Sequence, residues 1–238
     1  MIFEKAFSIF TQTPAINVSV LTIIQHAIEQ EIASSELSAL FSGIDGSIDP
    51  QKRRYGTSAL LGPLGYYNPT KIMEHICNNV RRGRLLRKEP SSPVFVYDYD
   101  HAGDIVRITN CSLRMVSYAL HYPAYDVFIC KESATNEIEH ILLLEKDESG
   151  RTSKWISFYW HNNMKVIGFV DIEVYRYIPT GFTCTAMHGI SSERGIFEGL
   201  SCDDFTFYLD EKGRVQTIDY PCRDEVHPRY QAFMHHLN

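Results

Sequence analysis

Residues 94–109 read VFVYDYDHAGDIVRIT, and this stretch decides the fold class. Val94 to Tyr99 and Asp104 to Thr109 are two runs rich in aromatic and β-branched residues, and Gly103 lies in the turn between them. Two such runs joined by a short turn predict an antiparallel hairpin. Pro93 stands directly before the first run and marks the change from helical to strand spacing.

Strand patterns continue towards the C-terminus. Asp147-Glu148-Ser149-Gly150 and Glu211-Lys212-Gly213 are strong hairpin turns. No helix of crossover length separates the runs, which favours antiparallel pairing over a doubly wound parallel sheet. The further predicted strands are Tyr125 to Cys130, Glu139 to Glu145, Lys154 to Trp160, Val166 to Tyr177, Phe205 to Leu209 and Arg214 to Asp219.

The residues before Pro93 have helical spacing instead. A stripe from Val20 to Ile32 predicts one amphipathic helix, and the pattern resumes from Leu37 to Phe41 and stops at Gly43. We expect a loop from Gly43 to Gly65, which is rich in Gly, Asp and Pro. Asn68 as N-cap and Pro69 at the first helical position predict a second helix, which ends at Gly83.

These patterns together predict one α+β domain spanning residues 1–238. Residues 1–90 form its helical and loop part, and residues 91–238 form a large, mainly antiparallel β-sheet or sandwich.

Composition narrows the class of protein. The net charge of -6 weighs against general nucleic-acid binding, which needs a basic field. We expect no membrane span and no secretory signal, because no apolar run reaches the required length and the N-terminus lacks the signal pattern. The six scattered cysteines predict buried, reduced thiols, no disulfide and a cytoplasmic, reducing location.

One motif resembles an active site. Asp98-Tyr99-Asp100 at the end of an apolar strand resembles the Asp-x-Asp of the haloacid-dehalogenase phosphatases, and Cys202-Asp203-Asp204 is similar to their late acidic pair. The resemblance implies a nucleophile at Asp98, a general acid at Asp100 and Mg²⁺. The motif departs from the family because it lies in mid-chain, leads into another strand and has Ala102 where Thr or Val is expected. Turn chemistry around Gly103 explains the same residues.

Metal and other catalytic motifs give no stronger signal. Cys184 and His188, and Cys222 and His227, are close in sequence, but structural zinc sites usually show tighter ligand pairs. No nucleophile elbow or phosphate-binding loop occurs. We therefore expect no zinc, no cofactor and no catalytic residue.

A basic cluster follows the second predicted helix. It would contact an anion or an acidic partner, or else complement the helix dipole while staying solvated. The cluster consists of Arg81, Arg82, Arg84, Arg87 and Lys88.

The hairpin of residues 94–110 is similar to the aromatic hairpin of cypovirus polyhedrins. That resemblance implies an N-terminal helix, a β-sandwich and self-assembly into a viral occlusion-body lattice, with the chain as its own partner. Arginine outnumbers lysine and aromatic residues are frequent, as is typical of buried interfaces. The alternative is an immunity-type inhibitor that binds one protein partner.

The predicted helix gives this hypothesis an assembly surface. An apolar stripe must be buried either on its own sheet or on a neighbouring molecule, and we expect the neighbour. The proposed assembly residues are Val20, Leu21, Ile24, Ile28 and Ile32.

Overall fold

The computed structural model describes residues 2–13, 15–34, 36–57, 84–161, 166–211 and 215–219. Three helices open the chain: α1 (Glu4–Gln12), α2 (Val18–Ser34) and α3 (Leu37–Ser47). The strands are β1 (Ile48–Gly56), β2 (Leu85–Leu86), β3 (Phe95–Asp100), β4 (Ile105–Asn110), β5 (Met115–His121), β6 (Tyr125–Glu132), β7 (Ile138–Lys146), β8 (Thr152–His161), β9 (Val166–Ile178), β10 (Gly181–Ile190), β11 (Ser201–Leu209) and β12 (Val215–Asp219).

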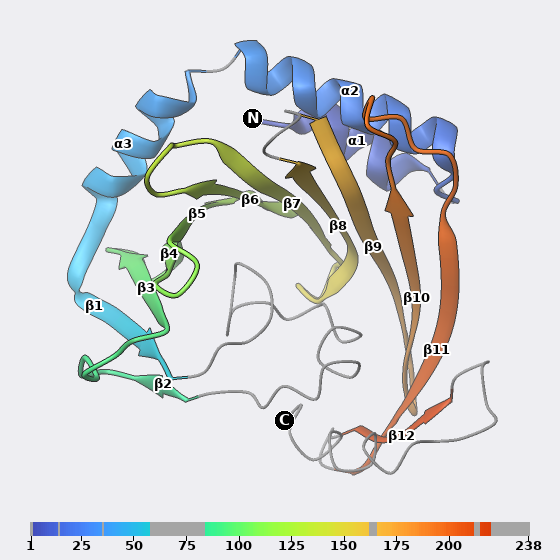
Figure 1. Ribbon diagram of the computed structural model, residues 1–238. Helices are drawn as coiled ribbons and strands as arrows, with labels where there is room; N and C mark the ends of the chain where they lie inside the picture. Colours follow the sequence, from blue (N-terminus) through green and yellow to red (C-terminus); the bar gives the residue numbers. More distant parts are fainter. Residues whose placement is uncertain are drawn as a thin grey trace.

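All of these strands join one sheet in the order β12-β11-β10-β9-β8-β7-β6-β5-β4-β3-β1-β2. Every pairing is antiparallel. The sheet curves strongly, and the three helices lie on the outside of the curve (Figure 1). The predicted α+β class is confirmed, with a single sheet rather than a sandwich of two.

Both faces of the sheet bury apolar side chains, because residues alternate between faces along a strand. On β7, Ile141 and Leu143 pack in the core beneath the helices, while Leu142 and Leu144 belong to a second cluster on the opposite face. The second cluster also holds the fully buried Trp155. The central strands therefore read as continuous apolar runs rather than as alternating ones.

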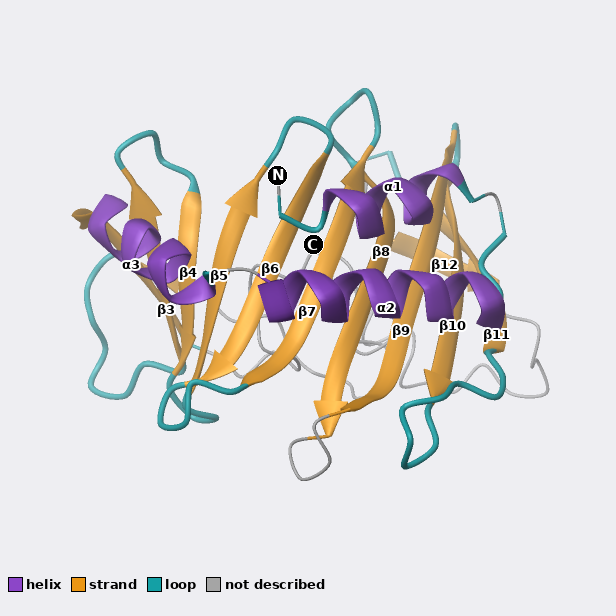
Figure 2. Cartoon of the chain, turned by 90° about the horizontal axis from the view of Figure 1, so that it is seen from above, coloured by secondary structure: helices purple, strands orange, loops and turns teal. Residues whose placement is uncertain are grey.

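The apolar stripe of α2 packs on the sheet of its own chain. Leu21, Ile24 and Ile28 have no exposed surface, and α2 lies across the middle strands of the sheet (Figure 2). The expectation that this stripe covers a neighbouring molecule is thus wrong for these three residues. Val20 and Ile32 are half-buried against the same core.

Helix α1 has no counterpart in the sequence prediction. Its aromatic side chains Phe7 and Phe10 are buried together with Phe3, and the Phe7 ring stacks on Tyr125 with 3.9 Å between centroids. The apolar positions are too few for a clear periodic signal, so the helix depends on the sheet that it covers.

The predicted loop from Gly43 is wrong for its first part. Helix α3 continues to Ser47, and β1 follows it without a break. Glycine in a helix costs about 1 kcal/mol relative to alanine. Here α3 is held by contacts to the sheet, since Phe41 stacks on Tyr118 at 4.3 Å and Asp45 binds Arg107 at 2.7 Å.

Four strands escaped prediction, namely β1, β2, β5 and β10. The first 90 residues also contribute β1 and β2 to the sheet, so the predicted boundary between a helical part and a β-rich part does not hold strictly. The predicted helix after Asn68, together with Arg81, Arg82, Cys77 and Cys222, lies outside the described residues.

Four cysteines are described, and all are free thiols: Cys130 and Cys184 are buried, whereas Cys111 and Cys202 are exposed. The expectation of buried thiols is thus wrong for two of them. Among the described helices, none has the length and apolar character needed to cross a membrane.

Candidate interaction edges of the sheet

Strand β1 lies near one end of the sheet and is only partly covered. It pairs with β3, but its pairing with β2 is limited to Tyr55 and Gly56. Its register against β3 breaks between Asp49 and Arg54, so several residues bulge out of the ladder. Bulges and basic side chains are common at exposed sheet edges.

Six basic residues gather at this end, and we call them the basic edge. Pairing of Tyr55 with Leu86 places the segment around β2 directly beside the end of β1. This brings the described members of the predicted basic cluster next to a second basic run that the sequence analysis assigned to a loop. The basic edge consists of Lys52, Arg53, Arg54, Arg84, Arg87 and Lys88.

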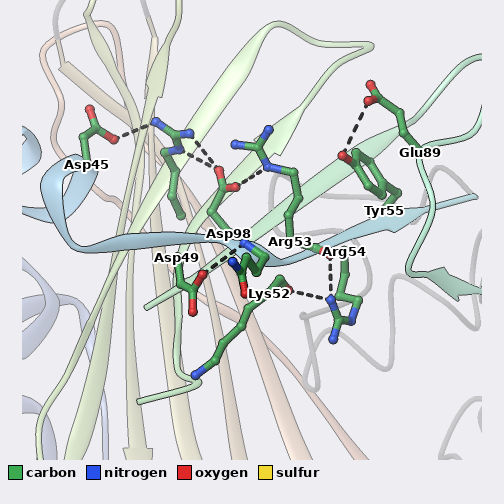
Figure 3. A network of polar contacts seen from close by, with 10 residues as sticks. Asp45, Asp49, Lys52, Arg53, Arg54, Tyr55, Glu89 and Asp98 are labelled. Atoms are coloured by element: carbon green, nitrogen blue, oxygen red, sulfur yellow. Dashed lines mark hydrogen bonds and ion pairs between the residues drawn. The ribbon is translucent and has the colours of Figure 1, made fainter. Parts of the chain in front are cut away.

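A buried carboxylate anchors the basic edge to the sheet (Figure 3). Asp98 on β3 has no exposed surface. Arg53 Nε donates to its Oδ1 at 2.6 Å, and Arg107 donates to its Oδ2 through Nε at 2.9 Å and through Nη2 at 2.8 Å. The hydrogen bond to Asp98 raises the pKa of Arg53. Two guanidinium groups therefore satisfy the buried charge.

The same network reaches helix α3. Arg107 Nη1 donates to Asp45 Oδ1 at 2.7 Å, and the Tyr118 hydroxyl donates to Asp45 Oδ2 at 3.2 Å. Burial opposes the charge of Arg107, but its bonds to Asp98 and Asp45 raise its pKa above the usual value. The network thus fixes the start of β1 by holding the helix that precedes it.

The remaining basic side chains have no carboxylate partner among the described residues. Lys52 Nζ donates to the His101 carbonyl at 2.6 Å, and Arg54 Nη1 donates to the carbonyls of Lys52 and Arg53 at 2.8 Å each. Arg84, Arg87 and Lys88 are exposed. Five positive charges therefore lie at this end of a chain of net charge -6, with Asp49 and Glu89 beside them.

The other end of the sheet is acidic. Asp203 and Asp204 are exposed on β11, and Asp210 and Glu211 follow the strand; we call these four residues the acidic edge. The Thr185 hydroxyl on β10 donates to Asp204 at 2.5 Å. Strand β12 pairs with β11 only from Thr206 onward, so no described strand covers residues 201–205 on that side. Figure 1 shows this part of β11 and the start of β1 on opposite flanks of the molecule.

The Asp-x-Asp motif is fully engaged in the hairpin. Asp98 lies in β3, bound to its two arginines, and Asp100 Oδ1 accepts from the backbone N–H groups of Gly103 at 2.7 Å and Asp104 at 2.9 Å. Burial opposes the charge of Asp100, but these backbone donors lower its pKa. Turn and ion-pair chemistry account for both carboxylates, as the hairpin interpretation predicted.

Cys184 and His188, which the sequence analysis weighed as zinc ligands and did not favour, do not meet; Cys222 and His227 lie outside the described residues. Cys184 and His188 lie four residues apart on strand β10, a separation of about 13 Å along an extended chain. Cys184 is buried, and its pKa is raised because burial disfavours the thiolate. His188 Nδ1 instead lies 2.6 Å from Asp171. In the part of the chain that is described, no three potential metal ligands come together.

Comparison with known proteins adds no relative. No protein-family model matches the chain, and no curated protein matches it.

Proposed function

We propose that the protein is a non-enzymatic interaction protein that self-associates through the two oppositely charged ends of its sheet. The observation that carries this proposal is the placement of the basic edge on β1 and β2 and of the acidic edge on β11. Contact between the basic edge of one copy and the acidic edge of the next is head-to-tail. Such a contact leaves one edge of each kind free, so it builds rings or extended arrays rather than closed dimers.

The strength of this contact follows from its chemistry. An exposed ion pair contributes about 0.5 kcal/mol, so four pairs supply about 2 kcal/mol. Such an interface is weak in isolation and is screened by salt, since the Debye length at physiological ionic strength is about 8 Å. Closure of a ring adds one further contact without adding a copy, so it stabilises the assembly beyond a single contact.

An occlusion-body lattice is the particular array that the polyhedrin-like hairpin suggests. The basic edge also fits an acidic protein partner, as an immunity-type inhibitor would have. The two functions differ in what the acidic edge does, because only self-association uses it.

Sedimentation velocity at increasing protein concentration tests the proposal. We expect the average mass to rise with concentration at low salt and to fall back to the monomer at about 0.5 M salt. The double variant Lys52→Glu/Arg54→Glu is expected to remain monomeric. Its matched control carries Arg176→Glu at an exposed position of β9 and should associate like the unmodified protein.

A protein that stays monomeric at low salt and high concentration would contradict self-association. In that case the basic residues protect an exposed sheet edge from pairing, as edge lysines commonly do.

A further inference from the structure

A cavity of about 720 Å³ lies between helix α2, strands β8 and β9 and the loop of residues 191–200. It is on the helix-covered side of the molecule and is separate from the basic edge. Its volume falls within the range of small-molecule sites. The cavity contains both charged and aromatic groups, which is the combination that orients a bound ligand.

One wall of the cavity is held in place by a buried amide. Gln25 on α2 is 5% exposed, and its Nε2 donates to Glu29 Oε1 at 3.0 Å and to the Gly195 carbonyl at 3.0 Å. The amide therefore ties the helix to the loop and orients the Glu29 carboxylate at the same time.

The opposite wall is a tight turn. Gly195 N donates to the Ser192 carbonyl at 2.8 Å, and Ser192 N donates to the Ile196 carbonyl at 2.9 Å. Gly195 has a φ of +72°, and a Cβ there would lie 3.2 Å from Val166 Cβ. Phe197 anchors the turn in the core at 2% exposure. The turn is thus fixed by its backbone conformation and its packing.

This turn presents two side chains with no evident structural role. The Arg194 guanidinium is exposed and forms no ion pair with another described residue. Ile196 is 57% exposed although it is a large apolar side chain. The indole of Trp160 and the side chain of Ile32 complete the apolar lining, and the imidazole of His26 also faces the cavity.

We propose that this cavity binds a small apolar molecule that carries both an ammonium and a carboxylate group, of which an apolar α-amino acid is the simplest case. Arg194 would bind the carboxylate, Glu29 the ammonium group, and Trp160 with Ile196 the apolar part. Charge-assisted hydrogen bonds to the two charged groups, which share the α-carbon, fix the orientation, and burial of the apolar side chain supplies most of the affinity.

Three probes of similar size distinguish the contributions of the two charged groups to binding. L-phenylalanine has both groups, phenethylamine lacks the carboxylate, and 3-phenylpropionate lacks the amine. Isothermal titration calorimetry on the full chain should show that phenylalanine binds at least fivefold more tightly than either analogue. The other tryptophan, Trp155, is fully buried in the second core cluster, so a change in tryptophan fluorescence on binding reports on Trp160.

Two variants show which side chain binds each charged group of the ligand. Arg194→Gln should weaken phenylalanine at least tenfold and leave phenethylamine unchanged. Glu29→Gln keeps an oxygen that can accept from Gln25, and it should weaken phenylalanine and phenethylamine but not 3-phenylpropionate. The matched controls, Arg176→Gln and Glu36→Gln, change exposed residues outside the cavity and should leave all three affinities unchanged.

Absence of binding by all three probes at about 10 mM would overturn the proposal. Binding of phenylalanine that Arg194→Gln leaves unchanged, with circular dichroism showing a folded variant, would overturn it as well.

Discussion

Asp98 places a carboxylate where no solvent reaches it. Removal of one partner from a buried ion pair commonly costs about 3–5 kcal/mol. The two arginines of Asp98 are 25% and 37% exposed, so water can partly solvate them once the carboxylate is lost. We therefore expect Asp98→Asn to lower the free energy of unfolding by about 2–3 kcal/mol. Urea denaturation followed by circular dichroism measures this change through the midpoint.

Asp104→Asn is the matched control for Asp98→Asn. Asp104 is exposed in the turn of the same hairpin, and its substitution should change the free energy of unfolding by less than about 0.5 kcal/mol. Equal losses in the two variants would show that the Asp98 network does not stabilise the sheet.

The surroundings of His121 favour its charged form. Its Nδ1 lies 2.7 Å from Asp126 Oδ1 and its Nε2 lies 2.7 Å from the Ile105 carbonyl. Both neighbours are acceptors, so only the imidazolium can donate to both. Burial and the nearby Lys146 oppose this charge, but the bonds to Asp126 and Ile105 raise the pKa of His121 above 6.5.

A raised folded pKa makes the stabilisation by His121 greatest at low pH. It is fully present below the pKa of the unfolded chain, near 6.5, and is lost as the pH rises through the higher folded pKa. We expect His121→Gln to destabilise the protein more at about pH 6 than at about pH 9, as measured by urea unfolding at both pH values. The same loss for His121→Gln at both pH values would refute the charged state.

Two adjacent residues test the docking of helix α2. Ile24 has no exposed surface, whereas Ile23 is 52% exposed on the same helix. Ile24→Ala should lower the free energy of unfolding by about 3 kcal/mol, and Ile23→Ala by less than about 0.5 kcal/mol. Thermal or urea unfolding of the two variants gives the comparison.

Helix α2 would have to pack elsewhere in solution if Ile24→Ala left the stability unchanged and deletion of residues 1–41 left a soluble monomer. We expect that deletion to give insoluble protein instead, because it exposes the core beneath the helices.

The elements that sequence patterns predicted are those with local signals. The hairpin around Gly103 and the runs from Val166 and Tyr125 carry their own turn residues and β-branched or aromatic side chains. Strand β1 has only Ile48 and Tyr55 of this kind, and Pro50 with three basic residues between them is typical of a loop. Strand β1 forms because it pairs with β3, and a single sequence does not show which distant segment will be its pairing partner.

Helix α3 shows the same limit. Gly43 is an ordinary stop signal, yet the helix continues past it because Asp45 lies within reach of Arg107, 62 residues further along the chain. Each glycine disfavours the helix by about 1 kcal/mol relative to alanine, and the tertiary contacts outweigh this cost.

For the molecule as a whole, the sequence indicated the charges of the candidate site but not their positions relative to each other. The charge of Arg84, Arg87 and Lys88 was evident, but its juxtaposition with Lys52 and Arg54 depends on the pairing of β1 with β2. The acidic residues of β11 lay in a motif that we first compared with a phosphatase. Their position at the opposite end of the sheet follows only from the order of the strands.

Charge exchange between the two edges shows whether they bind each other. Lys52→Glu/Arg54→Glu/Arg84→Glu/Arg87→Glu leaves four acidic and two basic residues on the basic edge, which makes it acidic. Asp203→Lys/Asp204→Lys/Asp210→Lys leaves three basic and one acidic residue on the acidic edge, which makes it basic. Each variant alone has two edges of like charge and should sediment as a monomer. In the mixture, one variant has two acidic edges and the other has two basic edges, so every contact between unlike variants joins opposite charges. Contact of the two altered edges, or of the two unaltered edges, also pairs a β1 end with a β11 edge as in the unmodified protein. We therefore predict that an equimolar mixture of the two variants at low salt sediments as larger assemblies. A mixture that remains monomeric, while the unmodified protein associates under the same conditions, would contradict the account.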